Sequence, residues 1–405
     1  MTSLSIKQKA QQYAVLTGMA LFIGLLVGAI DMIFGQGLLL IGDFRSQHWP
    51  LILFLALAGL VIVYLYKRFG GKASKGMGLI FDVGHAREEK IPLVLVPLIM
   101  LTTWMSHLFG GSVGREGVAV QIGATLSHRF ARHIKIPDAS RIFLMTGMAA
   151  GFAGLFQTPL AATFFALEVL TVGELQLIAL YPALIASIVA SFTSHALGLE
   201  KFAVPLKEML SWTPETLIKV AFLGLAFGLA GKLFAVSLSW LKKTVAKVLP
   251  NPYIRISVIG AGLSLVLLTL QLTKVGTYSG LGTNLIDVAF HQGSAQSYDW
   301  ILKLLFTVVT ISAGYQGGEV TPLFAIGATL GVFLAPLLGL PVLVVAAIGY
   351  ASVFGSATTT LLAPILIGGE VFGYGNLPFF VIACAIAYCL PKEWSIYSGQ
   401  KVAKK

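Results

Sequence analysis

Val320-Thr-Pro-Leu-Phe-Ala-Ile-Gly-Ala-Thr-Leu330 opens a stretch of fifty residues, ending at Gly369, that contains no Asp, Glu, Lys or Arg. A membrane-spanning helix needs about 20 apolar residues, so this stretch is long enough for two. Uncharged runs of spanning length also precede it, at residues 13–30, 49–66, 91–114, 142–167, 175–199 and 256–273. The pattern predicts an all-α polytopic integral membrane protein.

Composition leads to the same class of protein. Of 405 residues, 57% are hydrophobic and 11% are charged, against about 25% charged in a typical soluble domain. A soluble fold of this length could not bury so much apolar surface, so a soluble enzyme and a disordered chain are excluded. No separate soluble domain is expected either.

The net charge of +11 comes largely from short basic flanks between the apolar runs. The positive-inside rule accounts for such flanks and predicts that both termini are cytoplasmic, whereas nucleic-acid binding is not expected. The flanks contain Lys67, Arg68, Lys72 and Lys75; Arg129, Arg132 and Lys135; Lys242, Lys243 and Lys247; and Lys401, Lys404 and Lys405.

The two halves of the sequence resemble each other at a nearly constant offset. Ile122-Gly-Ala-Thr-Leu126 recurs 204 positions later as Ile326-Gly-Ala-Thr-Leu330, and Gly76-Met-Gly78 aligns with Gly280-Leu-Gly282 at the same offset. Shared small-residue composition could produce one such match, but several in one order favour a first transmembrane half at residues 1–205 and a second at 206–405. Repeats of this kind in transporters often have inverted topology and hold the ligand at their interface, although the sequence leaves the orientation open.

Gly111-Ser-Val-Gly-Arg-Glu-Gly-Val118 places Arg115 and Glu116 between an uncharged run and the predicted start of a helix. Charged groups at membrane depth are costly and usually line a pathway. The unpaired amides of a helix N-terminus bind anions, and a neighbouring carboxylate can occupy the same place. A proton on that carboxylate would remove its attraction to the amides, so Glu116 could link anion binding to proton binding. The alternative is an Arg115–Glu116 pair that only caps the helix.

Gly317-Gly-Glu-Val-Thr-Pro322 repeats this arrangement in the second half, and its proline suits the first turn of a helix. We expect the amides of Glu319 and Val320, together with the Thr321 hydroxyl, to face a ligand. The alternative role of Glu319 is to complement the helix dipole. Gly-rich breaks at membrane depth require a covering of protein or water, so we expect broken helices.

Four elements, in the same order, resemble the motifs of the CLC family of anion channels and anion/proton antiporters. The family's GSGIP, GREGP and GxFxP motifs correspond to Gly76-Met-Gly-Leu-Ile80, Gly114-Arg-Glu-Gly-Val118 and Gly318-Glu-Val-Thr-Pro322, and its late tyrosine corresponds to Tyr397. The resemblance covers nearly the whole chain. It implies short, tilted and discontinuous helices in two antiparallel halves, and a homodimer with a separate pathway in each chain.

The departures from these motifs resemble the bacterial fluoride/proton antiporter branch. Met77 stands where the family has its central serine, and Val169 stands where proton-coupled chloride exchangers have a second glutamate; Ile80 and Val118 replace motif prolines. The resemblance implies a secondary active transporter, not an enzyme, that exports fluoride in exchange for protons across a bacterial inner or plasma membrane. No cofactor and no metal site are expected.

The same resemblance implies roles for single residues. Glu116 is the gating glutamate, which competes with the anion and carries protons, and Glu319 could replace the missing internal proton-transfer glutamate. Glu168 and Glu370, matched across the repeat, are expected as helix-end acids, with a role in the proton path as the alternative. The expected anion-binding residues are Met77, Phe81, Gly114, Arg115, Gly117, Val320, Thr321 and Tyr397.

Alternatives remain open from the sequence. Phe81 could direct its positive ring edge at fluoride or only pack, and Tyr397 could be an interfacial tyrosine. A chloride transporter or passive anion channel of the same family is the nearest competing function. A more distant one is an intramembrane enzyme such as a serine protease, which would need an activated nucleophile; no GxSxG motif is present.

Overall fold

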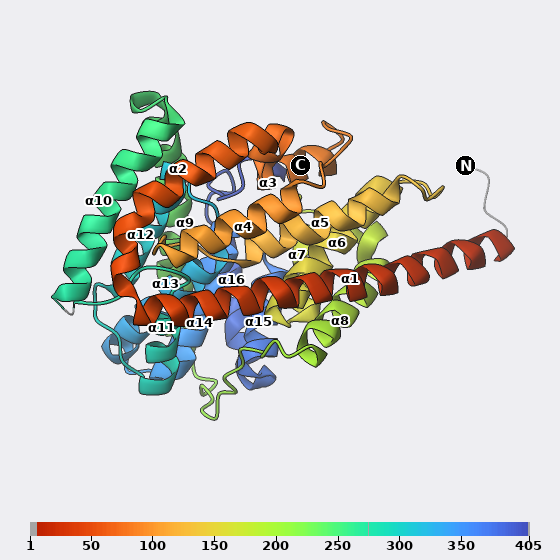
Figure 1. Ribbon diagram of the computed structural model, residues 1–405. Coiled ribbons are helices and arrows are strands. Elements are labelled where there is room, and N and C mark those ends of the chain that lie inside the picture. The colour runs from red at the N-terminus through yellow and green to blue at the C-terminus, as the bar shows by residue number, and fades with distance from the viewer. Residues whose placement is uncertain (1–5, 274, 404–405) are drawn as a thin grey trace.

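The computed structural model describes residues 6–273 and 275–403, most of which are helical (Figure 1). Lys404 and Lys405, part of the last basic flank, lie outside the described residues. The α-helices are α1 Ile6–Gln47, α2 Leu55–Leu65, α3 Met77–Gly84, α4 Leu95–Leu108, α5 Glu116–Ala131, α6 Ala139–Phe156, α7 Pro159–Glu168, α8 Leu180–Ala196, α9 Pro214–Val248, α10 Pro252–Leu272, α11 Thr283–Asp287, α12 Asp299–Ala313, α13 Val320–Leu338, α14 Val342–Thr358, α15 Leu362–Phe372 and α16 Leu377–Tyr388.

Short 3₁₀ and π segments extend or connect these helices. They are η1 Trp49–Phe54, η2 Tyr66–Gly70, η3 Gly71–Lys75, η4 Leu177–Ala179, η5 Val288–Gln292 and η6 Tyr374–Asn376. The expectation of an all-α chain has one small exception: β1 (Thr171–Val172) pairs in parallel with β2 (Lys401–Val402).

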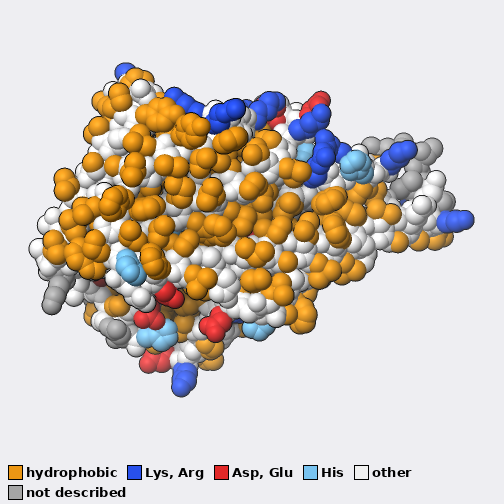
Figure 2. Space-filling model, in the orientation of Figure 1, with side chains coloured by type: hydrophobic (Ala, Val, Ile, Leu, Met, Phe, Trp, Pro, Cys, Tyr) orange, Lys and Arg blue, Asp and Glu red, His pale blue; other side chains and the backbone are white. Residues whose placement is uncertain are grey.

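The surface is that of a multi-pass membrane protein. Seven helical segments among the described residues are long and apolar enough to cross a bilayer. Figure 2 shows a broad band of apolar side chains, with Lys and Arg gathered along one edge and most of the visible Asp and Glu at the opposite edge. We call these edges the basic face and the acidic face.

Several helices end inside the molecule instead of crossing it. The run at 142–167 is two helices, because α6 stops before Gln157, which has a φ of +57°, and α7 begins at Pro159. The second half repeats this break, where α14 stops before Thr359, with a φ of +56°, and α15 begins at Leu362. The expectation of broken helices is confirmed.

The two halves run antiparallel to each other. Helices α1–α8 precede the irregular segment at residues 197–213, and α9–α16 follow it. Gly114 and Gly318 form an antiparallel bridge in which each amide donates to the other's carbonyl, at 2.5 and 2.7 Å. Equivalent motifs therefore meet face to face at the centre of the molecule.

Glu168 and Glu370 show the same inverted symmetry. Glu168, at the end of α7, accepts hydrogen bonds of 2.8–3.1 Å from the amides of residues 361–363 at the start of α15. Glu370, near the end of α15, accepts bonds from Leu160 and Ala161 at the start of α7, at 3.1 and 2.8 Å. Since each helix caps the N-terminus of the other, both glutamates satisfy amides that have no partner within their own helix.

Glycines bring the central helices into close contact. A Cβ at Gly123 of α5 would overlap the carbonyl of Gly147 on α6, and a Cβ at Gly327 of α13 would overlap that of Gly349 on α14. Small residues allow helix backbones to approach this closely within a membrane. The two Gly-rich motifs begin α5 and α13, so this packing fixes their positions.

The C-terminal segment folds back across the first half. Besides the β1–β2 pair, Gln400 donates to the carbonyls of Val169 and Thr358, at 2.8 and 3.1 Å. Gly399 lies against Phe81 of α3, and Tyr397 is carried into the interior with 6% of its surface exposed.

Gly147→Ala should destabilise the protein, because the added methyl group meets the backbone of α5. Overpacking of a core typically costs about 1–3 kcal/mol. Gly18→Ala in α1 is the matched control, since nothing lies within 4 Å of its added Cβ. Thermal unfolding of the purified proteins compares the two, and equal melting temperatures would contradict this account of the packing.

Candidate functional site

The first turn of α5 lies directly against the start of α13. The strand-like pairing of Gly114 with Gly318 leaves no room for side chains: a Cβ at Gly114 would lie 2.8 Å from the Pro322 ring and 3.0 Å from the Gly318 oxygen. Glycine is therefore required where the two motifs cross. Beyond the bridge, α5 begins at Glu116 and α13 at Val320, as the sequence predicts.

The carboxylate of Glu116 crosses from the first half to the second. Its Oε2 accepts hydrogen bonds from the Thr321 amide at 3.1 Å and the Thr321 hydroxyl at 2.5 Å. The amide belongs to the first turn of α13, where the helix dipole favours negative charge. Glu116 is fully buried, so its carboxylate occupies the anion-binding end of a helix from the opposite half.

Arg115 holds this carboxylate only weakly, because its amide donates to Glu116 Oε2 at a distance of 3.4 Å. Its Nε lies 3.5 Å from Glu116 Oε1, too far for a strong hydrogen bond. Among the described residues, neither of these two buried atoms has a hydrogen-bond partner. A simple Arg115–Glu116 cap would leave the two bonds to Thr321 unexplained, so the structure favours the interpretation in which Glu116 links the halves.

Glu319 lies beside the first turn of α5. It is the N-cap residue of α13, and its Oε2 is 3.7 Å from the position that a Cβ at Gly117 would take. Each Gly-rich motif therefore brings one carboxylate to the N-terminus of the other half's helix. Whether the amides of Glu319 and Val320 face an anion stays a prediction, since the Thr321 amide holds the carboxylate here.

Phe81 and Tyr397 form a second group, on the side of the basic face. Their ring centroids are 5.3 Å apart, and Phe81 is buried in α3. The Tyr397 hydroxyl is buried without a hydrogen-bond partner among the described residues, so this donor suits a polar ligand. Met77 begins α3 and packs, partly buried, against the core.

Two further residues of this region are not among the predicted site residues. Gln121, one turn into α5, donates to the Gly117 carbonyl at 3.1 Å, while its buried Oε1 has no described partner. An amide side chain one turn after the first Gly-rich motif was a usable signal. Phe165 of α7, with its ring centroid 6.4 Å from that of Tyr397, gave no signal within an apolar run.

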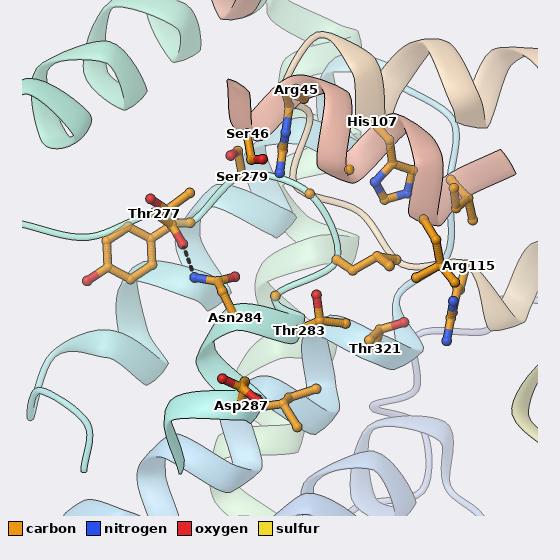
Figure 3. Close-up of a pocket in the computed structure, with 18 of the residues that line it drawn as sticks. Arg45, Ser46, His107, Arg115, Thr277, Ser279, Thr283, Asn284, Asp287 and Thr321 are labelled. Carbon is orange, nitrogen blue, oxygen red and sulfur yellow. Dashed lines mark hydrogen bonds between the residues drawn. The ribbon is translucent and has the colours of Figure 1, made fainter. Parts of the chain in front are cut away.

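A cavity of about 670 Å³ extends from Glu116 to the acidic face, and Figure 3 shows residues that line it, among them Arg115, Thr321 and Asp287. Arg115, Glu116 and Thr321 line its inner end, and the exposed side chains of Asp43 and Asp287 line its mouth. Cationic and polar groups, among them Arg45, His107, Ser46, Ser279 and Asn284, line the space between.

Glu116 closes this cavity at its inner end. Glu116 lines the cavity, whereas Phe81 and Tyr397 do not. In this position the side chain can take a proton from the cavity. Once protonated, it would be held less strongly by Thr321, whose N–H and O–H would become donors for an anion.

The family model described as voltage gated chloride channel matches residues 58–392. This chain belongs to the CLC family. The fold is confirmed by a solved structure, a CLC-type fluoride/proton antiporter, with a TM-score of 0.94 and 51% identity over 99% of this chain and 100% of that one. A slow cyanobacterial Cl⁻/H⁺ antiporter is similar in fold, with a TM-score of 0.78 and 22% identity over 95% and 96% of the two chains.

A curated relative agrees with this membership. It is a chloride/fluoride channel protein of Pseudomonas syringae pv. tomato, 37% identical over 384 residues, which are 94% of this chain and 85% of the relative. The CLC fold and the Gly-rich motifs recognised in the sequence are therefore those of this family.

Thr321→Val should weaken the link between the halves, because it removes the hydroxyl bond to the carboxylate. A hydrogen bond to a charged group is worth about 1.5–3 kcal/mol, and the free energy of unfolding in the absence of fluoride should fall by about that amount. Thr321→Ser keeps the hydroxyl and is the matched control. If the valine variant is as stable as the serine variant, the hydroxyl bond does not hold Glu116.

Proposed function

We propose that this protein is a fluoride/proton antiporter, a secondary active transporter that exports fluoride from the cytoplasm in exchange for protons. The observation that carries the proposal is the Glu116 carboxylate on the two Thr321 donors at the closed end of a polar cavity. The similarity of the whole chain to a CLC-type fluoride/proton antiporter supports the same function.

The exchange follows from competition between the Glu116 carboxylate and fluoride for the N-terminus of α13. Ionised Glu116 occupies the N-terminus of α13, and fluoride arriving from the cytoplasm displaces it toward the cavity. There the carboxylate takes up a proton. The protonated side chain returns inward as fluoride leaves through the cavity, so each cycle moves an anion out and a proton in.

Glu319 is proposed to receive the proton on the cytoplasmic side. Its Oε2 lies near the first turn of α5, which begins at Glu116. Val169 occupies the place of the usual internal glutamate. Glu168 binds three amides at the start of α15, which supports a capping role.

Fluoride is favoured over chloride by the donors near Glu116. A small, strongly hydrated anion needs several close donors to replace its water. The Thr321 amide and hydroxyl, the Tyr397 hydroxyl and the edge of Phe81 can supply them, with Gly114, Arg115, Gly117 and Val320 forming the adjoining motif backbone. The competing function is chloride transport, either coupled to protons or passive. It is supported by the description of the Pseudomonas relative as a chloride/fluoride channel protein.

The orientation and assembly complete the proposal. By the positive-inside rule we propose that the basic face and both termini are cytoplasmic and that the cavity opens to the outside. We propose a bacterial inner or plasma membrane as the location. The proposed transport unit is one chain with halves at residues 1–205 and 206–405. Two such chains are proposed to form a homodimer.

Glu116→Gln should abolish proton coupling, because an amide cannot carry the proton. Proteoliposomes loaded with fluoride are placed in fluoride-free, weakly buffered medium, and external fluoride and pH are followed together. Wild type should release fluoride and alkalinise the medium, whereas the variant should give no more proton uptake than empty liposomes.

Glu174→Gln is the control for this assay, since Glu174 is an exposed acid on the loop after β1. Proton-coupled exchange at the wild-type level in Glu116→Gln would remove Glu116 from the central role. Faster efflux from chloride-loaded than from fluoride-loaded wild-type liposomes would favour the chloride transporter.

Glu319→Gln should reduce the protons moved per fluoride, because the inner proton acceptor is lost while the Thr321 donors remain. The same two-ion recording gives this ratio. An unchanged ratio would show that protons leave Glu116 by another route, and the assignment of Glu319 would then be dropped.

A further inference from the structure

A second cavity, of about 650 Å³, lies on the basic face, away from the transport site. Its walls come from three separated parts of the first half: the end of η2 with Gly71 and Lys72, residues 90–94 before α4, and the end of α5. None of these residues takes part in the proposed exchange, so the exchange does not explain the lining of this cavity.

The charged side chains that line it are all cationic, and His128 lines it as well. Lys72, Lys90, Arg129 and Arg132 line it, and no Asp or Glu does. Lys72 is already paired, with its Nζ 2.6 Å from Glu88. For Lys90, Arg129 and Arg132, no carboxylate of the described chain lies within 4.0 Å. Three uncompensated cations around one hollow attract an anion.

The remaining lining is apolar and faces outward. Phe69, Leu93 and Val94 line the same cavity and have 54%, 43% and 36% of their surface exposed. The cavity therefore lies where the apolar band of the protein meets the basic face. This boundary is visible in Figure 2. At that depth in a membrane, lipid headgroups lie against the cations and acyl chains against the apolar side chains.

The start of α4 supplies a further attraction for negative charge. This helix begins at Leu95, next to the cavity wall, without a side-chain cap and without an acid in its first turn. The amides of Leu95 and Val96 donate to the carbonyls of Pro92 and Leu93, so what this end offers is the positive end of the helix dipole. The positive-inside rule explains why lysines and arginines lie on this face, but it does not explain their convergence on one hollow beside the start of a helix.

We propose that this cavity binds an anionic phospholipid, with the phosphate headgroup between Lys90, Arg129 and Arg132 and an acyl chain along Phe69 and Leu93. A phospholipid is the occupant that matches both linings, because a free phosphate would leave the apolar wall unused. The site adds a lipid ligand on the basic face and does not depend on which ion the protein transports.

The test variant is Arg129→Gln/Arg132→Gln, which removes two positive charges from the cavity. The control is Lys243→Gln/Lys247→Gln, which removes two positive charges from the end of α9 on the same face. Phosphatidylglycerol binding to each full-length protein in detergent is titrated by native mass spectrometry. A basic residue near a lipid headgroup contributes about a five-fold change in affinity, so the arginine variant should bind on the order of thirty-fold more weakly than wild type. The lysine variant should bind as wild type does.

Three further measurements distinguish specific phospholipid binding from a folding defect, from binding of any lipid and from binding of free phosphate. Arg129→Lys/Arg132→Lys keeps the charge and should retain most binding, which guards against a folding defect. Phosphatidylcholine should bind much more weakly than phosphatidylglycerol, and inorganic phosphate at millimolar concentration should not displace the lipid. Equal losses in the arginine and lysine variants, equal affinity for the two lipids, or displacement by inorganic phosphate would each overturn the proposal.

Discussion

The amide of Thr321 must be satisfied at the start of a helix that begins inside a membrane. No residue of its own helix can accept that hydrogen bond, because the first amides of any helix lack an internal partner. Glu116, which starts the matching helix of the other half, supplies the acceptor. This contact requires an antiparallel repeat, glycines where the two backbones cross, and helices that stop at the centre of the bundle, and the fold has all three.

The same chemistry occurs at three glutamates of the described residues, with different consequences. Glu168 accepts three amides and Glu370 accepts two, and both hold the broken helices α7 and α15 together. Glu116 accepts the amide and hydroxyl of Thr321 and, at 3.4 Å, the amide of Arg115, and it lines a cavity that leads to the surface. The number of donors does not separate these three glutamates. The cavity beside Glu116 gives its carboxylate a space to move into, as a gate requires.

Much of this could be predicted from local sequence signals. Fifty uncharged residues indicate membrane helices, matching pentapeptides indicate a duplication, and Gly-rich turns before Glu116 and Val320 indicate where helices begin. The pairing of Glu116 with Thr321 could not be derived from spacing, because it joins residues 205 positions apart and depends on the relative orientation of the halves. Nor could the cavity be foreseen, since Asp43 and Arg45 reach it from the end of α1, far along the chain from the motifs.

The central claim is that one carboxylate and one anion compete for the donors of Thr321. Fluoride binding measured by calorimetry between pH 5 and 8, for wild type and for Glu116→Gln, tests this directly. Competition predicts that the affinity of wild type for fluoride weakens as pH rises, while that of the variant stays constant and exceeds wild type at the alkaline end. The same pH dependence in both proteins would show that Glu116 and fluoride do not share a site.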